Sequence, residues 1–394
     1  MTSAEKRLVL AIVGALTFSS VYAMLVMAPV LTPISDEFGV STGTAGLVVA
    51  AYGGPGVITG LLAGPYSDRF GRKRFLVAGA LIMGVFTVLS ALAPTFETLI
   101  LARAMAGIGG SLIFPNANAL IGDVFAYTER GRAMATMIAF TTMASVIGVP
   151  VAGVVSEATS WRVSVGLVGV IAIAAGIALA AFLRPMTSNI SEARIWAMYR
   201  LILRNASAVA AIVSSFLGSL YWFTWITYLV VFFQQTYGLS EGTASTYSLT
   251  LGLGVLVGSQ IGGRIGDRIG HRPVVAGTIV ASGVILLALT SAPPPLLAAA
   301  AMNFALSAVI GARFATNSSL LTEQVPEARG TLFAFSSATA SLSIVAGAAM
   351  GGFFVDTIGF GAIGVFCMGT ALLSSVVVLA FVREDPLEVD IGAA

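Results

Sequence analysis

The sequence contains few charged residues, one cysteine and one histidine, and each scarcity excludes a class of protein. Lys, Arg, Asp and Glu make up 10% of the 394 residues, whereas a soluble domain carries about 25%. One cysteine, Cys367, excludes an internal disulfide, and one histidine, His271, argues against a metal site or a catalytic triad. The net charge of +2 gives no case for nucleic-acid binding. We therefore expect no metal, no cofactor and no enzyme activity.

Apolar residues are abundant instead, at 57% of the chain, and glycine occurs 44 times. A membrane-spanning helix needs about 20 mainly apolar residues. The sequence predicts an all-α membrane protein with twelve such helices, and these are Leu8–Val30, Gly43–Gly64, Phe75–Ala93, Glu97–Ile121, Ala133–Val155, Val163–Leu183, Ala206–Phe233, Gly242–Gly263, Val274–Ser291, Leu296–Leu321, Thr331–Val355 and Ile358–Val382.

The longest connection, residues 184–205, divides the chain into predicted six-helix bundles at 1–183 and 206–394. This linker mixes arginine with Trp, Tyr and Met, which is typical of an amphipathic helix at a membrane surface. Placing both termini in the cytoplasm leaves Arg162 as the one basic residue in a predicted outside loop. Because cytoplasmic loops are rich in Lys and Arg, we expect a multi-pass protein of the cell membrane with both termini inside.

The two halves are copies of each other. A shift of 199 residues, the separation of Gly64 from Gly263, aligns Phe38–Ala45 with Tyr237–Ala244 and Gly153 with Gly352. Parallel repeats of this kind are typical of transporters, which bind substrate near the bilayer midplane between the repeats. The expected partners are therefore the lipid bilayer and a small-molecule substrate. We expect the protein to be a monomer.

A loop motif follows the second predicted helix. It reads Gly64-Pro-Tyr-Ser-Asp68-Arg69-Phe-Gly71-Arg72-Lys73, with a weaker copy from Gly263 to Arg272. It resembles the Gly-x-x-x-Asp-Arg-x-Gly-Arg-Arg/Lys motif of the major facilitator superfamily, and the resemblance covers essentially the whole chain. It implies the major facilitator fold, with a likeness to the bacterial twelve-helix drug and sugar efflux permeases of the proton-antiporter group.

The resemblance also implies a conformational gate. In the family, the Asp of the motif docks against the second half in the outward-open state, and the later Arg pairs with an acid at the inner end of helix 4. The matching residues here are Asp68, Arg72 and Asp123. A simpler reading is that the basic residues only hold the loop inside. The full set of candidate gate residues is Gly64, Asp68, Arg69, Gly71, Arg72, Asp123, Asp267 and Arg268.

Two further segments partly match family motifs. Arg103 begins Arg-Ala-Met-Ala-Gly-Ile-Gly on helix 4, which resembles Arg-x-x-Gln-Gly-x-Gly, and the family links this Arg to proton coupling. Helix 5 carries Gly148-Val-Pro150-Val-Ala-Gly153, which is similar to the Gly/Pro-rich helix of proton-coupled exporters. The alternatives are an Arg that only braces backbone carbonyls and a simple proline kink.

Arg103 and Arg313 are the charges placed within predicted helices, and no Asp or Glu lies clearly at mid-membrane. A buried charge is costly and usually functional, so an anionic or zwitterionic substrate is favoured over a dication. Asparagines and aromatic residues could complete the cavity. The candidate substrate-binding residues are Tyr22, Arg103, Asn116, Asn118, Tyr221, Trp225, Arg313 and Asn317.

The sequence thus predicts a secondary transporter that exports a small amphipathic organic compound by proton antiport. One alternative is a facilitator or exchanger of an organic anion held by Arg103 and Arg313. A second, from another class, is a membrane sensor built on the transporter fold. No nucleotide-binding glycine motif is visible, so ATP is not expected to supply the energy.

The predicted orientation can be tested by labelling two introduced cysteines. With both termini in the cytoplasm, the linker position Ser188 lies inside and Thr243 lies outside. A membrane-impermeant thiol reagent added to whole cells should therefore label Thr243→Cys and spare Ser188→Cys until the cells are opened. Labelling of Ser188→Cys in intact cells would reverse the topology.

Overall fold

The computed structural model describes residues 3–125, 127–182, 192–325 and 328–384, and these residues form helices joined by short turns. The helices are α1 (Ser3–Leu25), α2 (Leu31–Phe38), α3 (Thr42–Ala45), α4 (Leu47–Gly53), α5 (Gly56–Phe70), α6 (Arg72–Ala91), α7 (Phe96–Val124), α8 (Tyr127–Met143), the π-helix η1 (Ala144–Gly148), α9 (Val149–Ala158), α10 (Trp161–Phe182), α11 (Glu192–Arg204), α12 (Ala206–Tyr237), α13 (Glu241–Thr246), α14 (Ser248–Ile269), α15 (His271–Ser291), α16 (Leu296–Gln324), α17 (Arg329–Thr357) and α18 (Phe360–Phe381).

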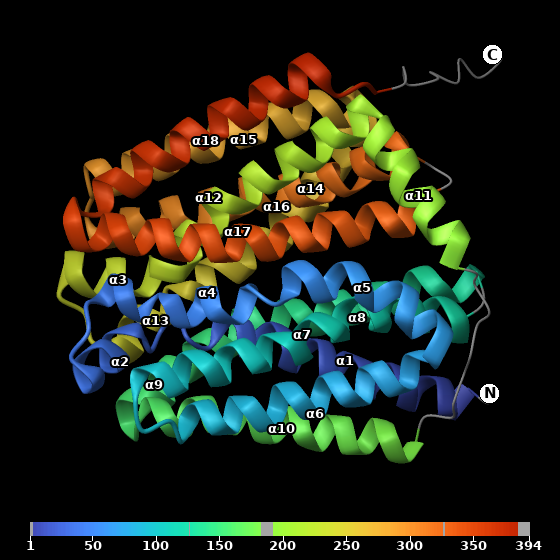
Figure 1. Cartoon of the computed structure of the whole chain (residues 1–394). Helices are drawn as coiled ribbons and strands as arrows, with labels where there is room; N and C mark the ends of the chain where they lie inside the picture. Colours follow the sequence, from blue (N-terminus) through green and yellow to red (C-terminus); the bar gives the residue numbers. More distant parts are fainter. Residues whose placement is uncertain (1–2, 126, 183–191, 326–327, 385–394) are drawn as a thin grey trace.

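The long helices lie side by side in two groups that follow the order of the chain (Figure 1). In the N-terminal half, α6 packs against α7 and α10, while α1 packs against α8 and α10. In the C-terminal half, α14 packs against α16 and α15 against α18. The halves meet where α17 contacts α3, α4 and α5 and where α13 contacts α9. This arrangement is the all-α architecture expected of the major facilitator fold.

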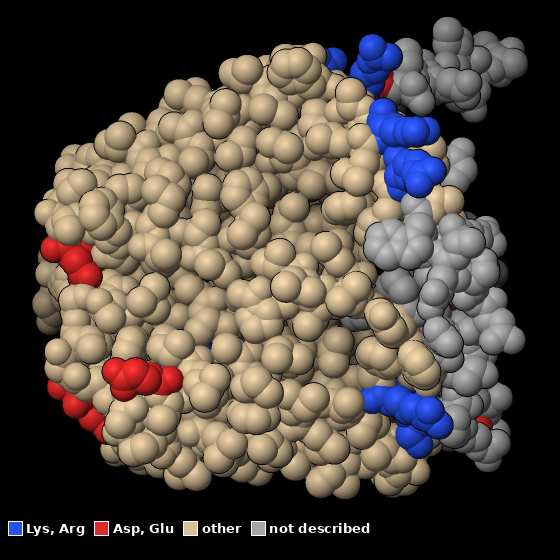
Figure 2. Space-filling view, in the orientation of Figure 1, with Lys and Arg blue, Asp and Glu red and all other residues tan. Residues whose placement is uncertain are grey.

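Both chain ends and α11 lie at one end of the molecule, which we call the terminal end (Figure 1). The opposite end, with α2, α3 and α13, is called the distal end. On the face drawn in Figure 2, Lys and Arg gather at the terminal end, Asp and Glu gather at the distal end, and the surface between them carries neither. An uncharged band of this kind suits a protein surrounded by lipid. Which end faces the cytoplasm stays a prediction.

Eleven segments of the described chain are long and apolar enough to cross a membrane. They account for every predicted span except the one at 242–263, which the structure divides into α13 and α14. The 22 residues of α14 are enough for a span. Its glycines, together with Arg264, Asp267 and Arg268 near its end, lower its hydropathy. The count of twelve spans therefore stays a prediction.

Two predicted spans are interrupted where glycine or proline weakens a helix. The span at 43–64 breaks at Gly46 and again at Gly54-Pro55, which separates α3, α4 and α5. The span at 133–155 contains η1, which ends two residues before Pro150. Proline removes one backbone donor and its ring crowds the preceding turn, so the hydrogen-bond pattern must shift there. Such interruptions are tolerated in a membrane where protein or cavity surrounds them.

Small residues bring α14 and α16 into close contact. An added Cβ at Gly254, Gly258 or Gly262 would approach the backbone of α16 to between 1.7 and 2.5 Å, and at Gly258 the nearest atom is the carbonyl oxygen of Ala308. The four-residue spacing places these glycines on one face of α14. Lipid gives helices no hydrophobic reason to associate, so close packing of small residues supplies much of the attraction.

We predict that Gly258→Ala destabilises the protein, because the added methyl group meets a backbone oxygen that cannot move aside. Overpacking of this kind costs about 1–3 kcal/mol. Gly263→Ala on the same helix is the matched control, since its Cβ would meet no atom within 4 Å. The melting temperature of the purified protein should fall for Gly258→Ala alone. Equal melting temperatures for both variants would contradict the packing described.

Candidate functional site

A cavity of about 490 Å³ lies between the two halves near the middle of the long helices. A space of this size accommodates a small organic molecule. The N-terminal half contributes residues from α1, α4, α5, α7, α8 and η1, and the C-terminal half contributes residues from α12, α14, α16 and α17. The lining thus comes from both repeats, as expected for a transporter binding site.

The cavity wall is apolar, with hydroxyl groups as its main polar feature. Phe114, Trp222, Phe223 and Phe314 supply aromatic surface. Hydroxyl groups come from Ser20, Tyr52, Ser111, Thr141, Thr142, Ser145, Ser337 and Ser341. Among the described residues that line the cavity, none carries a charge. Such a wall can stack a ring and exchange a few hydrogen bonds, but it cannot neutralise an ionic group.

Tyr52 on α4 connects this wall to a buried cation. Its hydroxyl group donates to the Ser20 carbonyl oxygen at 3.3 Å and lies 3.5 Å from the Met83 sulfur. Its ring faces the guanidinium carbon of Arg103 at 4.5 Å from the ring centroid. A cation over an aromatic face is attracted by the electron-rich ring. Tyr52 therefore separates Arg103 from the cavity.

Arg103 on α7 is fully buried and binds backbone oxygens of two other helices. Nη2 donates to the Ala23 carbonyl at 2.8 Å, and Nε donates to the Val48 carbonyl at 3.4 Å. Nη1 has no hydrogen-bond partner among the described residues. The Ala23 carbonyl lies in the last turn of α1, where backbone carbonyl oxygens have no N–H donor within the helix. These contacts fit the bracing role better than direct contact with substrate.

Arg313 on α16 is also buried, within the C-terminal half. Its Nη2 donates to the Ser215 carbonyl at 3.4 Å, and its guanidinium group lies over the rings of Tyr221 and Phe314. Its Nε and Nη1 have no hydrogen-bond partner among the described residues. Phe314, and not Arg313, faces the cavity. The two arginines therefore occupy the separate interiors of the two halves.

The other candidate binding residues are not among those that line the cavity. Trp225 donates to Asn303 at 3.0 Å, and Tyr221 accepts from Ser282 at 2.9 Å. Asn317 pairs with Ser215 at 3.0 Å, and Asn116 donates to the Leu112 carbonyl at 2.7 Å. Tyr22 packs against Gly148, and Asn118 is half-buried on α7. None of the eight is among the cavity-lining residues in this conformation, and their role in binding stays a prediction.

Sequence reasoning missed the residues that do line the cavity because its polar and aromatic members are mostly serine, threonine and phenylalanine. These residue types occur throughout membrane helices and carry no motif. Trp222 is next to the candidate Tyr221 in the sequence, and a helix turns by about 100° between neighbours, so the two side chains face different directions. The signal that could have found the wall was the small-residue stretch Ser337–Ser341 opposite Gly53 and Gly56.

The loop motif makes a sharp turn at the terminal end. Gly71 and Gly270 take φ values of +93° and +94°, which L-residues with side chains rarely adopt. Arg72 pairs with Asp123 through a 2.7 Å contact, which is the pair implied by the family resemblance. The side chains of Gly64, Asp68 and Arg69 lie outside the described residues. Their gate role therefore stays a prediction.

The second copy of the motif makes a different contact. His271 takes the place of Arg72, and its Nε2 lies 3.6 Å from Glu323 and 3.9 Å from Asp267. Asp267 is exposed, with 73% of its side chain accessible. Glu384 accepts from the backbone amides of His271 and Arg272 and so caps α15. A gate role for Asp267 and Arg268 is untested by these contacts.

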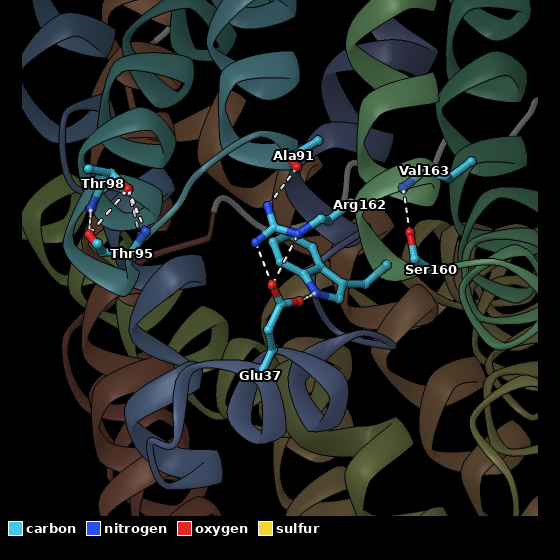
Figure 3. Close-up of polar contacts among 8 residues, drawn as sticks. Glu37, Ala91, Thr95, Thr98, Ser160, Arg162 and Val163 are labelled. Carbon is cyan, nitrogen blue, oxygen red and sulfur yellow. Dashed lines mark hydrogen bonds and ion pairs between the residues drawn. The ribbon is translucent and has the colours of Figure 1, made fainter.

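The distal rim of the N-terminal half is held by Glu37 on α2 (Figure 3). Arg162 and Trp161 donate to its carboxylate, with a shortest distance of 2.5 Å for each, and Arg162 also reaches the Ala91 carbonyl at 2.8 Å. Burial alone would raise the pKa of Glu37, but hydrogen bonds from Arg162 and Trp161 outweigh it and lower the pKa. The contacts join α2, the end of α6 and the start of α10.

We predict that Arg103→Lys lowers stability and transport together. A lysine keeps the charge but lacks the planar fork that reaches two carbonyl oxygens on different helices. If Arg103 braces the N-terminal half, the melting temperature falls first and the initial flux falls in proportion to the folded fraction. A steep loss of flux at an unchanged melting temperature would instead indicate a role in substrate or proton binding. Arg313→Lys provides the matching test in the other half.

The comparisons with known proteins agree with this architecture. The family model described as Major Facilitator Superfamily matches residues 10–259 and 240–393. The uncharacterized MFS-type transporter YwfA of Bacillus subtilis (strain 168) is 25% identical over 370 residues, covering 92% of this chain and 90% of that protein. Multidrug resistance protein 1 of the same organism is 30% identical over 156 residues, which is 40% of each chain.

Solved structures show the same fold. A D-xylose-proton symporter aligns with a TM-score of 0.79 at 17% identity, covering 97% of this chain and 99% of that one. A bacterial homolog of the human lysosomal transporter Spinster aligns with a TM-score of 0.75 at 18% identity, covering 96% and 95%. The chain therefore belongs to the major facilitator superfamily and is a multi-pass membrane transporter.

Proposed function

We propose that this transporter exports a small, uncharged or weakly polar amphipathic organic compound by alternating access, in exchange for protons. The observation that carries the proposal is the cavity between the halves, whose described lining is aromatic and hydroxyl-bearing and has no charge. An ionic substrate would lose its hydration there without gaining a partner, at a cost of several kcal/mol. A compound with a ring and one or two hydrogen-bonding groups would find both kinds of contact.

Export and breadth of substrate are supported by the relatives. Multidrug resistance protein 1 and the multidrug transporter protein MdtP, both of Bacillus subtilis (strain 168), match parts of this chain. The helix-5 glycine and proline residues resemble those of proton-coupled exporters, and the structure gives them close contacts with α1 and with the other half. Aromatic, weakly polar walls are the kind of surface that accepts several related compounds.

The organic-anion alternative is less well supported by the geometry. It assigned the anion to Arg103 and Arg313, yet each lies within its own half behind Tyr52 or Phe314. Arg103 still has one guanidinium nitrogen, and Arg313 two, without a hydrogen-bond partner among the described residues. A conformation that turned these groups toward the cavity would be needed for anion binding. The sensor alternative likewise lacks a supporting contact in the part of the chain that the structure describes.

We predict that a matched set of aromatic ligands will separate these possibilities. A neutral amide should stabilise the purified protein against heat more than the carboxylate or the amine built on the same ring, because the cavity wall has no counter-charge. Trp222→Ala should weaken binding of the amide roughly 2- to 12-fold, the effect of one aromatic contact of about 0.5–1.5 kcal/mol. Phe381→Ala, exposed on the outer surface of α18, should bind normally.

The best ligand should then be followed in proteoliposomes. Proton exchange requires that efflux of the amide accelerates when a pH gradient is imposed and slows when the gradient is collapsed by an ionophore. Preference for the carboxylate, weakened by Arg103→Lys or Arg313→Lys, would replace the present proposal with the anion alternative. A flux that does not change with the pH gradient would leave the proposed substrate class standing and would rule out proton exchange.

A further inference from the structure

At the distal end, two carboxylates each accept hydrogen bonds from the opposite half of the protein. Asp356, near the end of α17, accepts from the hydroxyl group of Ser41 at 2.6 Å and from the backbone amide of Gly43 at 2.8 Å. Glu157, near the end of α9, accepts from the hydroxyl group of Ser240 at 3.0 Å and from the backbone amide of Gly242. Each acid therefore binds a serine and a glycine of the opposite half.

The internal repeat relates these two contacts. The separation of 199 residues that aligns the halves carries Ser41 to Ser240, Gly43 to Gly242 and Glu157 to Asp356. The pairing is crossed, because each repeat contributes its acid to the other repeat's serine and glycine. This reciprocity is the rule of a two-fold interface, in which residue i contacts j and j contacts i. The distal contact between the halves thus has the form of a symmetric dimer interface within one chain.

Glycines allow the helices to meet at the same two places. An added Cβ at Gly43 would lie 2.2 Å from the carbonyl oxygen of Gly352, and one at Gly153 would lie 2.2 Å from the hydroxyl oxygen of Ser245. Gly153 and Gly352 are again related by the repeat. The helix-5 glycine singled out in the sequence therefore lies at the meeting of the halves, with its copy on α17 at the second meeting point.

We propose that Glu157 and Asp356 form a two-part latch that holds the distal end of the cavity closed, and that the protein opens toward the distal side by releasing both parts. The proposal rests on the alternating-access transport proposed above. A carboxylate bound to a hydroxyl and an amide makes strong, directional contacts. When the halves separate, water can replace both partners, so release leaves no buried charge unpaired.

The two parts of the latch are not identical, because an additional acid, Glu241, lies beside Glu157. This residue begins α13 beside Glu157, whereas its counterpart in the repeat is the uncharged Thr42. Its Oε1 is buried without a hydrogen-bond partner among the described residues.

The elements packed most closely on α13 are α9, α12 and α14. Glu157 is the charge on α9, α12 carries no ionic residue, and the charges of α14 lie near its other end at Arg264, Asp267 and Arg268. The titratable residues nearest to α13 in the chain on these elements are Tyr237 on α12 and Tyr247 before α14.

The environment of Glu241 gives the latch a pH dependence with a defined sign. Burial raises the pKa of Glu241 to about 7, the hydroxyl group of Ser156 opposes the rise and the charge of Glu157 adds to it. In an open state, water would return the pKa toward its ordinary value of 4.5. The closed state then binds the proton more tightly and is favoured by acid. That advantage is complete below about pH 4.5 and is lost as the pH rises to about 7.

The latch can be tested by measuring distances across the distal end without any substrate. Spin labels at Glu97→Cys on α7 and Leu297→Cys on α16 place one probe in each half at exposed positions, and the buried Cys367 stays in place. Glu157→Gln and Asp356→Asn should each raise the ratio of long to short distances about tenfold, as expected for losing hydrogen bonds to a charged group. The double variant should exceed either single variant. Adding Glu241→Gln to Asp356→Asn should remove the change of this ratio between pH 4.5 and 7.

Two controls make the outcome decisive. Glu37→Gln removes a distal acid whose described partners, Arg162 and Trp161, lie in its own half, so the distance distribution should not change. Gly352→Leu places a side chain between the halves and should force them apart whether or not the acids act as a latch. If this wedge lengthens the distance while the double acid variant matches Glu37→Gln, the latch is refuted and alternating access stands. If neither the wedge nor the acid variants change the distance, the latch and the alternating-access proposal both fail.

Discussion

The structure depends on the requirement that backbone N–H and C=O groups find partners where lipid supplies none. A helix meets this requirement within its own segment, which explains why the described chain is helical throughout its long apolar runs. Departures from the helix occur where the protein can compensate. The π-turn before Pro150 and the breaks at Gly46 and Gly54 lie where the two halves meet or line the cavity, and these are the places where an alternating-access cycle needs adjustable backbone.

The second level of organisation comes from the close approach of helices at small residues. Gly254, Gly258 and Gly262 join helices within the C-terminal half, whereas Gly43 and Gly352 join the two halves. The difference lies in what surrounds them. The contact within the half runs along α14 and α16, and the residues nearest to its three glycines are Phe304, Ser307, Ala308 and Ala312, which carry no charge. The contact between halves ends in carboxylates that water can reach and replace. In the proposed cycle, the same residue type therefore supports a permanent interface within a half and a releasable one between the halves.

Electrostatic groups follow the same division. Arg103 and Arg313 are enclosed within their halves, where carbonyl oxygens and aromatic rings partly compensate their charge. Because neither arginine lines the cavity, an organic compound can contact the cavity wall without meeting an ionic group. Carboxylates that link the halves lie at the distal end, and the Arg72–Asp123 pair lies at the terminal end. In the proposed mechanism, substrate binds in the middle of the molecule and the contacts at its two ends control access.

The sequence by itself determined the membrane character, the placement of most helices, the repeat and the family, because apolar run length and the loop motif are local properties of the chain. It also indicated the Arg72–Asp123 pair through the family resemblance, and Gly71 as a turn. Only the tertiary structure decided that Arg103 and Arg313 lie behind Tyr52 and Phe314 and that serine, threonine and phenylalanine line the cavity. The reason is geometric: a residue's depth along a helix can be read from its position, but the direction it faces depends on how that helix is rotated against its neighbours. The same holds for Glu157 and Asp356, because only the packing of the halves places each beside the other repeat.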